Sequence, residues 1–248
     1  MNIVAIVQAR MGSSRFPNKV MADIEGHPMV WHIVNRLRQA DLLQNVVIAI
    51  PDDERNRPIG WMAWSESIPC FTGSETDLIK RIYGTARAVR ADVVVRITGD
   101  CPMTDPDVAD KVIEEYLVGD WQYVCNVRPR TYPDGLNVEV YSIQLLENLN
   151  NEIEDSVYRE WFPVYVWENV APHLMHNVPY KKDLSGLRWT VDYPEDLEFV
   201  RCIYDRLGND FRMHDVLALL GRKPELAKIN ARPNDSYYDF PYKEKEIE

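Results

Sequence analysis

The feature that most constrains the fold is an alternation of short apolar runs with segments of helical periodicity. Runs rich in β-branched residues predict buried strands at 2–7, 45–50 and 92–98. Segments with apolar residues at helical spacing predict helices at 29–39, 77–89 and 107–118. Strands and helices that alternate at this spacing are typical of βαβ units. The chain is therefore expected to form an α/β fold, with a mainly parallel central sheet and helices on both of its faces.

The remaining elements give a weaker and more mixed pattern. Further strands are expected at 69–72, 123–127, 136–141 and 188–191. Further helices are expected at 143–150, 156–169, 194–207 and 213–220, and Pro163 interrupts the second of them. We expect one domain over residues 1–230, with a small mixed α+β region at about 121–187. Residues 231–248 lack periodicity and are expected to form an irregular tail.

Charge and apolar length exclude several classes of partner. The net charge is −11, whereas binding to nucleic acid or to an anionic membrane needs an excess of Lys and Arg, so neither partner is expected. The apolar run at the N-terminus is too short for a signal peptide, and no stretch is long enough to cross a bilayer, so we expect a cytoplasmic location. The widely spaced cysteines are expected to be reduced thiols and not a zinc site: they are Cys70, Cys101, Cys125 and Cys202.

The loop after the first strand has the composition of an anion-binding site. Ligands of parallel sheets bind at the carboxyl ends of strands, and this loop begins at such an end. It contains three cations, one glycine and two serines: Arg10, Gly12, Ser13, Ser14, Arg15 and Lys19. It fits neither the dinucleotide fingerprint nor the P-loop pattern. The glycine allows close approach of the backbone, and the hydroxyls and cations suit phosphate oxygens. A solvated basic loop is the alternative.

Two aspartates follow predicted strands. Asp100 ends the run 92–98 in Thr-Gly-Asp-Cys-Pro, and Asp192 follows 188–191 just before the helix that Pro194 opens. Carboxylates delivered from two strand ends to one crevice suit Mg²⁺ bound to a nucleotide. For Asp192, capping of the helix is the alternative interpretation.

Three further segments bear on the site. The segment 73–77, Gly-Ser-Glu-Thr-Asp, is either a nucleotide-ribose loop or a helix start capped by Ser74. Asn137 and Glu139 share one strand face after the turn Pro133-Asp134-Gly135, and that face is expected to point toward an acceptor. The aromatic residues of 156–169 indicate either a homodimer interface or packing within one chain: they are Trp161, Phe162, Tyr165 and Trp167.

Taken together, these motifs resemble the cytidylyltransferases that activate acidic sugars, the CMP-Kdo and CMP-sialate synthetases. The opening Gln-Ala-Arg-Met-Gly-Ser-x-Arg of the spore coat polysaccharide biosynthesis protein F subgroup is reproduced at 8–15. The similarity continues through 73–75, 98–102, 133–140, 159–160 and 190–196. Two departures stand out: Asn18 replaces a usual glycine, and Trp161-Phe162 replaces a frequent His-Val pair, so no histidine role is carried over.

The resemblance implies a Rossmann-like, three-layer αβα nucleotidyltransferase fold and an enzyme. It implies transfer of CMP from CTP to a small acidic sugar with release of pyrophosphate, Mg²⁺ as the cofactor, and a homodimer. The implied catalytic residues are Arg10, Arg15, Lys19 and Asp100, and the implied metal ligands are Asp100 and Asp192. The same four catalytic residues are also expected to bind the nucleotide. The other expected nucleotide contacts are Ala9, Gly12, Ser13, Ser14, Gly73, Ser74, Asp77 and Thr98. The expected acceptor contacts are Asn137, Glu139 and Arg159.

Three rival functions follow from the same residues. Enzymes that join a nucleoside triphosphate to a sugar 1-phosphate typically open with Leu-Ala-Gly-Gly-x-Gly, which is absent here. A cytidylyltransferase for a phosphonate or another phosphorylated acceptor fits the motifs equally well. A non-catalytic nucleotide-binding relative is disfavoured, because both aspartates and all three loop cations are present. The choice of CTP over other nucleotides follows from the resemblance alone.

Overall fold

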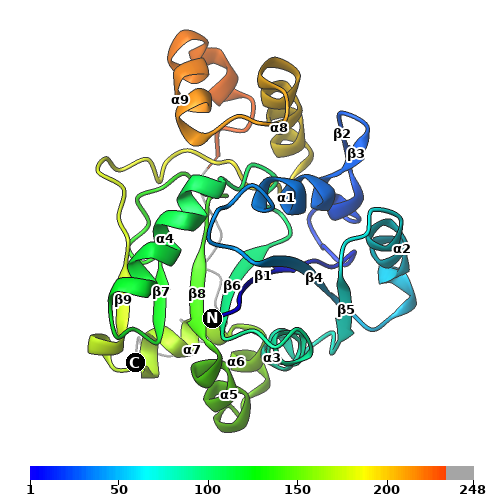
Figure 1. The fold of residues 1–248 in the computed structure, drawn as a ribbon. Coiled ribbons are helices and arrows are strands. Elements are labelled where there is room, and N and C mark those ends of the chain that lie inside the picture. The colour runs from blue at the N-terminus through cyan, green and yellow to red at the C-terminus, as the bar shows by residue number, and fades with distance from the viewer. Residues whose placement is uncertain (233–248) are drawn as a thin grey trace, which may run out of the picture.

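A seven-stranded sheet forms the centre of the computed structural model, which describes residues 1–232 (Figure 1). The rest of the expected tail, 233–248, lies outside the described residues. The strand order is β5-β4-β1-β6-β8-β7-β9. The strands are β1 (Ile3–Gln8), β4 (Asn45–Pro51), β5 (Cys70–Gly73), β6 (Val93–Thr98), β7 (Tyr123–Cys125), β8 (Glu139–Ser142) and β9 (Met175–Asn177). A separate hairpin contains β2 (Asp23–Ile24) and β3 (His27–Pro28).

The first half of the sheet is parallel and the second half is mixed. Strand β1 pairs in parallel with β4 and β6, and β4 pairs in parallel with β5. Strand β8 runs antiparallel to both β6 and β7, in a register that sets Arg96 opposite Glu139. Strand β9 pairs in parallel with β7. The predicted α/β fold with a mainly parallel sheet is therefore confirmed.

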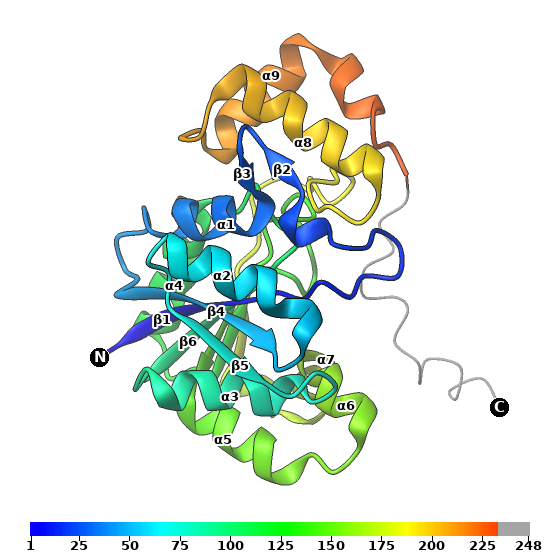
Figure 2. The same cartoon turned by 90° about the vertical axis from the view of Figure 1, so that its right-hand side faces the viewer.

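Helices cover both faces of the sheet and complete three layers (Figure 2). One face carries α1 (Met29–Leu37), α2 (Arg57–Ser65) and α4 (Pro106–Val118), with α8 (Pro194–Leu207) and α9 (Met213–Arg222) stacked beyond them. The other face carries α3 (Leu78–Ala88), α5 (Ile143–Glu152), α6 (Ser156–Glu160) and α7 (Phe162–Asn169). In the part of the chain that the structure describes, no helix is long and apolar enough to cross a membrane.

The central strands divide their side chains between two cores. In β1, Ala5 and Val7 pack with the α1 layer, whereas Val4 and Ile6 pack with α3 and α5. Because both faces are buried, these strands appear in the sequence as continuous apolar runs. Continuing the alternation, Gln8 and Arg96 extend the face of Ile6 and Val94, toward α3.

The expected strand at 188–191 is wrong, since only an isolated bridge joins Arg188 to Asp134. The backbone of Trp189 donates to Asp134 and packs against Gly135, which has φ +113°. A Cβ at Gly135 would lie 2.5 Å from the Trp189 carbonyl carbon. The two segments thus cross closely and do not extend a ladder.

The interruption expected at Pro163 within 156–169 is present. The segment forms two helices, α6 and α7, which meet at Trp161, and Pro163 lies in the first turn of the second. The structure also contains α2, which our sequence analysis missed. Its signal is weak but present: Pro58 lies in its first turn, and Ile59, Met62 and Ala63 form its buried face.

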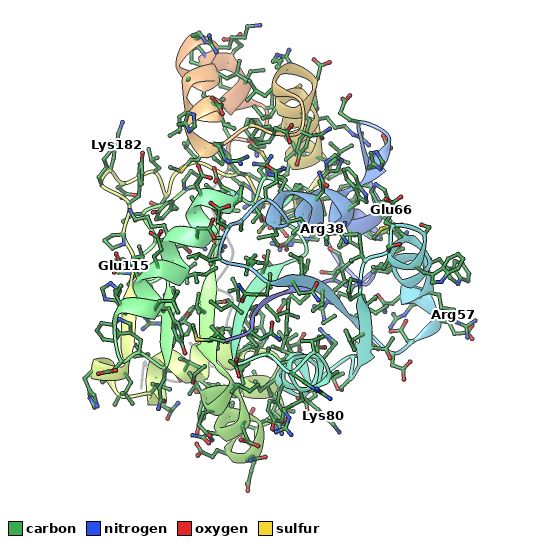
Figure 3. All side chains as sticks on the ribbon, viewed as in Figure 1. Arg38, Arg57, Glu66, Lys80, Glu115 and Lys182 are labelled. Carbon is green, nitrogen blue, oxygen red and sulfur yellow. The ribbon has the colours of Figure 1, made fainter. Side chains whose placement is uncertain are left out.

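Most charged side chains point away from the layers into solvent. Figure 3 labels several that do so, including Arg57 on α2, Lys80 on α3 and Glu115 on α4. Several exceptions gather near the carboxyl ends of β1 and β6, where Lys19, Arg96 and Asp192 are buried. Buried charge is unfavourable unless it is paired, so this end of the sheet is where function is expected.

Candidate active site

A pocket of about 310 Å³ opens at the carboxyl ends of β1 and β6. The loop after β1 and the segment Thr98–Cys101 after β6 form its floor, and α3, α7 and the segment before α8 supply its walls. Gly99 allows the two loops to leave the sheet side by side. Its N–H donates to the Gln8 carbonyl oxygen at 2.8 Å, and a Cβ there would lie 2.6 Å from that oxygen.

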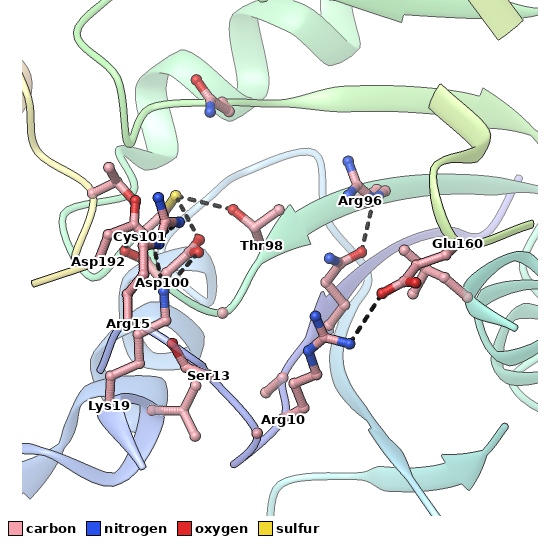
Figure 4. Close-up of a pocket in the computed structure, with 18 of the residues that line it drawn as sticks. Arg10, Ser13, Arg15, Lys19, Arg96, Thr98, Asp100, Cys101, Glu160 and Asp192 are labelled. Carbon is pink, nitrogen blue, oxygen red and sulfur yellow. Dashed lines mark hydrogen bonds and ion pairs between the residues drawn. The ribbon is translucent and has the colours of Figure 1, made fainter. Parts of the chain in front are cut away.

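Four charged side chains converge in this pocket and are termed the strand-end cluster: Arg15, Lys19, Asp100 and Asp192 (Figure 4). The Lys19 Nζ donates to Asp100 Oδ2 at 3.1 Å and to Asp192 Oδ1 at 2.9 Å. It also donates to the carbonyl oxygen of Val191 at 2.8 Å. Arg15 Nη2 donates to the same Asp192 oxygen at 2.8 Å. Residues far apart in the sequence thus share one network of ion pairs.

A buried arginine binds the second carboxylate oxygen of Asp192. Arg188 donates to Asp192 Oδ2 at 2.9 Å and to Asp196 Oδ1 at 2.9 Å. Asp196 in turn accepts the backbone N–H groups of Asp192 and Tyr193, each at 2.9 Å. Burial opposes the charge on Asp196, but the hydrogen bonds from Arg188 and from Asp192 N–H lower its pKa. Asp196, in the first turn of α8, thereby holds the segment that carries Asp192.

Lys19 and Asp100 of the strand-end cluster are both charged at neutral pH. Burial would lower the pKa of Lys19, but Asp100 and Asp192 outweigh it and raise that pKa above its usual value. Burial would raise the pKa of Asp100, but Lys19 and nearby hydrogen bonds lower it to about 2. Next to Asp100, burial and the carboxylate raise the pKa of Cys101 well above its usual value. Cys101 is therefore a protonated, buried thiol.

The donor chemistry at Asp100 fits a divalent metal ion. Its side chain is 30% exposed, and its carboxylate lies where phosphate oxygens and water would complete the shell of a hard cation. Asp192 is only 6% exposed and accepts from three cationic side chains, so it reaches a metal only after Lys19 or Arg15 leaves Oδ1. Within residues 1–232, no three His, Cys, Asp or Glu side chains gather as a metal site. A metal here would take most of its ligands from the nucleotide and water.

A second network, termed the sheet-face cluster, contains Gln8, Arg96 and Glu139. Arg96 Nε donates to Gln8 Oε1 at 2.8 Å, and Arg96 Nη1 pairs with Glu139 Oε2. Glu139 Oε1 accepts from the hydroxyls of Tyr123 at 2.7 Å and Tyr141 at 3.0 Å. Sequence reasoning missed Gln8 and Arg96. The available signal was an arginine within the most apolar strand, which requires a buried partner.

Most of the predicted site residues line the pocket. They are Ala9, Arg10, Gly12, Ser13, Ser14, Arg15, Lys19, Thr98, Asp100, Asn137 and Asp192. Arg10 pairs with Glu160 at 3.2 Å on the side of the pocket away from the strand-end cluster, as Figure 4 shows. Gly73, Ser74, Asp77, Glu139 and Arg159 do not line it.

The residues outside the pocket have structural partners. Asp77, and not the expected Ser74, caps α3 by accepting from Lys80 N–H at 3.0 Å, whereas Ser74 Oγ accepts from Asp77 N–H at 3.1 Å just before the helix begins. Arg159 Nε donates to Asp77 Oδ2 at 2.7 Å, and its other nitrogens bind Asn150 and the Ile153 carbonyl oxygen. Arg159 thereby ties α6 to α3 and α5.

The loop 73–77 is also held from within the pocket wall. Arg81 of α3 donates to the carbonyl oxygen of Ser74 and, at 3.4 Å, to that of Glu75. Burial, with the nearby charge of Arg10, lowers the pKa of Arg81 to about 10. Arg10, Arg81 and Arg96 therefore lie near one another on the α3 side of the pocket, where Glu160 pairs with Arg10 and Glu139 pairs with Arg96.

The chain is similar to proteins of one family. A family model described as cytidylyltransferase matches residues 4–160. The spore coat polysaccharide biosynthesis protein SpsF of Bacillus subtilis is 29% identical, over 91% of this chain and 97% of that protein. A solved cytidylyltransferase from Leptospira borgpetersenii superposes with a TM-score of 0.88 and 28% identity, over 94% of this chain and 99% of that one. A CMP:2-keto-3-deoxy-manno-octonic acid synthetase solved with CTP shares the fold, with a TM-score of 0.64 and 19% identity over 83% and 99% of the two chains.

Proposed function

Because this chain belongs to the cytidylyltransferase family, and so is a nucleotidyltransferase, we propose that it transfers CMP from CTP to an acidic sugar of the ulosonic or nonulosonic type. Pyrophosphate is the second product, and Mg²⁺ is the cofactor. The observation that carries the proposal is the convergence of Lys19, Arg15 and Asp100 at the carboxyl ends of β1 and β6. There a triphosphate meets both cationic side chains and a carboxylate that can share a metal.

In this proposal, the loop after β1 binds the triphosphate. Arg10, Arg15 and Lys19 pair with phosphate oxygens, and Ser13 and Ser14 donate hydroxyl hydrogen bonds. An acceptor oxygen attacks the α-phosphorus in line as pyrophosphate leaves, so the protein contributes mainly position and charge neutralisation. Asp100 and Asp192 would hold the Mg²⁺, which when bound neutralises phosphate charge and polarises the α-phosphate. Lys19 and Arg15 then exchange their carboxylate partners for phosphate oxygens.

Asn137, Glu139 and Arg159 are the expected acceptor contacts, and only the first of them lines the pocket. Asn137 lines the pocket, and its Nδ2 is held by Asp134 Oδ1 at 3.1 Å. We propose Asn137 as a direct acceptor contact. Glu139 and Arg159 act from outside the pocket, by holding Arg96 and α3 respectively.

A homodimer stays a prediction. Of the four aromatic residues that suggested an interface, Phe162 is buried within its own chain and Trp161 lines the pocket. Tyr165 and Trp167 pack partly against the α3 core, and they keep some exposed surface for a partner.

The decisive experiment measures pyrophosphate release from CTP and Mg²⁺ over a panel of acceptors. We expect release with an acidic sugar such as 3-deoxy-manno-octulosonate or N-acetylneuraminate, and loss of that release on chelation of the metal. Release only with sugar 1-phosphates or phosphonates would replace the acceptor class. A chain that binds CTP but does not release pyrophosphate with any acceptor of the panel would be a non-catalytic relative.

A further inference from the structure

Gln8 ends β1 at the floor of the pocket, and its side-chain amide has one fixed orientation. Its Oε1 accepts from Arg96 Nε at 2.8 Å. An arginine can only donate hydrogen bonds, so the oxygen of the amide must face Arg96 and the NH₂ group must face away. A rotation of the amide by 180° would place donor against donor.

Arg96 cannot move to accommodate such a rotation. It is 6% exposed, and its Nη1 pairs with Glu139, which is 2% exposed and lies opposite it in the β6–β8 register. The hydroxyls of Tyr123 and Tyr141 hold the second oxygen of Glu139. Removing Arg96 from this network would leave a buried carboxylate without its counter-charge, which is strongly unfavourable.

The NH₂ group of Gln8 is therefore a donor presented to a ligand. Gln8 lines the pocket and is partly exposed, and no residue in the described part of the chain accepts a hydrogen bond from its Nε2. The walls of the same pocket include the apolar side chains of Leu78, Trp161 and Pro163. Apolar and aromatic surfaces around a few oriented polar groups suit a planar ring.

The place of Gln8 in the chain relates it to the nucleotide. It directly precedes the loop that, in the proposed function, binds the triphosphate, and it lies on the face of the sheet that α3 covers. On that proposed function we base a further step: we propose that Gln8 reads the nucleobase, its amide N–H groups donating to O2 and N3 of cytosine.

The fixed amide would then select between pyrimidines. Cytosine presents adjacent acceptors at O2 and N3, whereas uracil carries a hydrogen on N3 and would place a donor against the amide donor. A freely rotating glutamine would turn its oxygen toward uracil, but Arg96 holds that oxygen. Arg96 and Glu139 are thus positioning residues, and selectivity comes from rejecting the wrong base as well as from binding the right one.

The test compares binding of CTP and UTP to the full chain with Mg²⁺, by isothermal titration calorimetry. The wild type is expected to prefer CTP. Gln8→Met, which is similar in size but has no donor, is expected to weaken CTP binding about tenfold and to remove the preference. Gln8→Glu keeps one oxygen on Arg96 and presents the other as an acceptor, so the preference is expected to shift toward UTP. Loss of a merely structural residue would produce no such shift.

Gln144→Met is the matched control, because Gln144 is exposed on α5 and lies outside the pocket. It is expected to leave both affinities unchanged. An unaltered ratio of CTP to UTP affinity in both Gln8 variants would overturn the role of Gln8 and leave the proposed function standing. A wild type that binds neither nucleotide, or both equally, would overturn the base-reading role, and absence of CTP binding would overturn the proposed function as well.

Discussion

The two clusters of the pocket handle charge in opposite ways. The strand-end cluster is delivered by loops. Its Lys19 and Asp192 are buried, but Arg15 and Asp100 keep about a third of their side-chain surface exposed, at 37% and 30%. The sheet-face cluster is delivered mainly by neighbouring strands, and Arg96 and Glu139 are almost completely buried. Ion pairs near solvent can exchange partners when a phosphate or metal arrives, whereas a buried pair cannot be broken without a large penalty. The first cluster is therefore suited to binding changing charge, and the second to holding a shape.

The largest effect is expected in the buried pair. Glu139→Gln leaves the Arg96 guanidinium buried without a counter-charge, which should destabilise the fold by about 3–5 kcal/mol in urea unfolding. The matched change Glu160→Gln removes the half-exposed partner of Arg10 and should change stability by less than about 1 kcal/mol. Equal effects of the two substitutions would remove the distinction between the clusters.

In the strand-end cluster, Asp100→Asn should act on turnover more than on stability. The amide keeps the shape of the carboxylate but loses the charge that the metal and Lys19 require, so kcat should fall by about 10²–10³-fold. Pyrophosphate release and a urea unfolding curve, measured on the same sample, test the two parts. Near-normal release would contradict the assignment of Asp100 as a metal ligand.

Lys19→Met should weaken CTP binding by about 10–100-fold, because it removes a charge-assisted hydrogen bond to phosphate. Calorimetric titration of CTP in the presence of Mg²⁺ measures this loss. Lys80→Met, on the exposed face of α3, is the control and should leave the affinity unchanged. If the two variants bind CTP equally, Lys19 serves only to hold the aspartates together.

The smallest effect is a dependence of stability on pH in the metal-free protein. The pKa of Asp100 is about 2 in the fold and about 3.9 in an unfolded chain, so its charge stabilises the fold above about pH 4. That stabilisation is lost as pH falls toward 2. The difference in Tm between wild type and Asp100→Asn should be constant above about pH 5 and should shrink steadily as the pH falls from about 5 to 2. A difference as large at pH 2 as at pH 6 would contradict the pairing of Asp100 with Lys19.

Several features of the site could be predicted from local sequence alone. The strands β1 and β6 can be recognised in the sequence as apolar runs, because both faces of the sheet are buried. The loops that carry Lys19 and Asp100 can be recognised because they directly follow those runs. The path of the chain into Asp192 could not be predicted in this way. The run 188–191 has the composition of a strand, but Gly135 crosses it too closely for a ladder to continue.

The sequence by itself determined the α/β class, the family resemblance and the position of the cation-rich loop, because periodicity, β-branched runs and motif order are properties of neighbouring residues. Only the tertiary structure decided the partners. Lys19 meets Asp192, Arg188 meets Asp196, and Gln8 receives its orientation from Arg96 through contacts between residues distant along the chain. Arg159, an expected acceptor contact, pairs with Asp77 and does not line the pocket. The sequence shows that a residue is cationic but not which carboxylate it pairs with. Pairing depends on which strand ends meet at one edge of the sheet, and the strand order sets that arrangement.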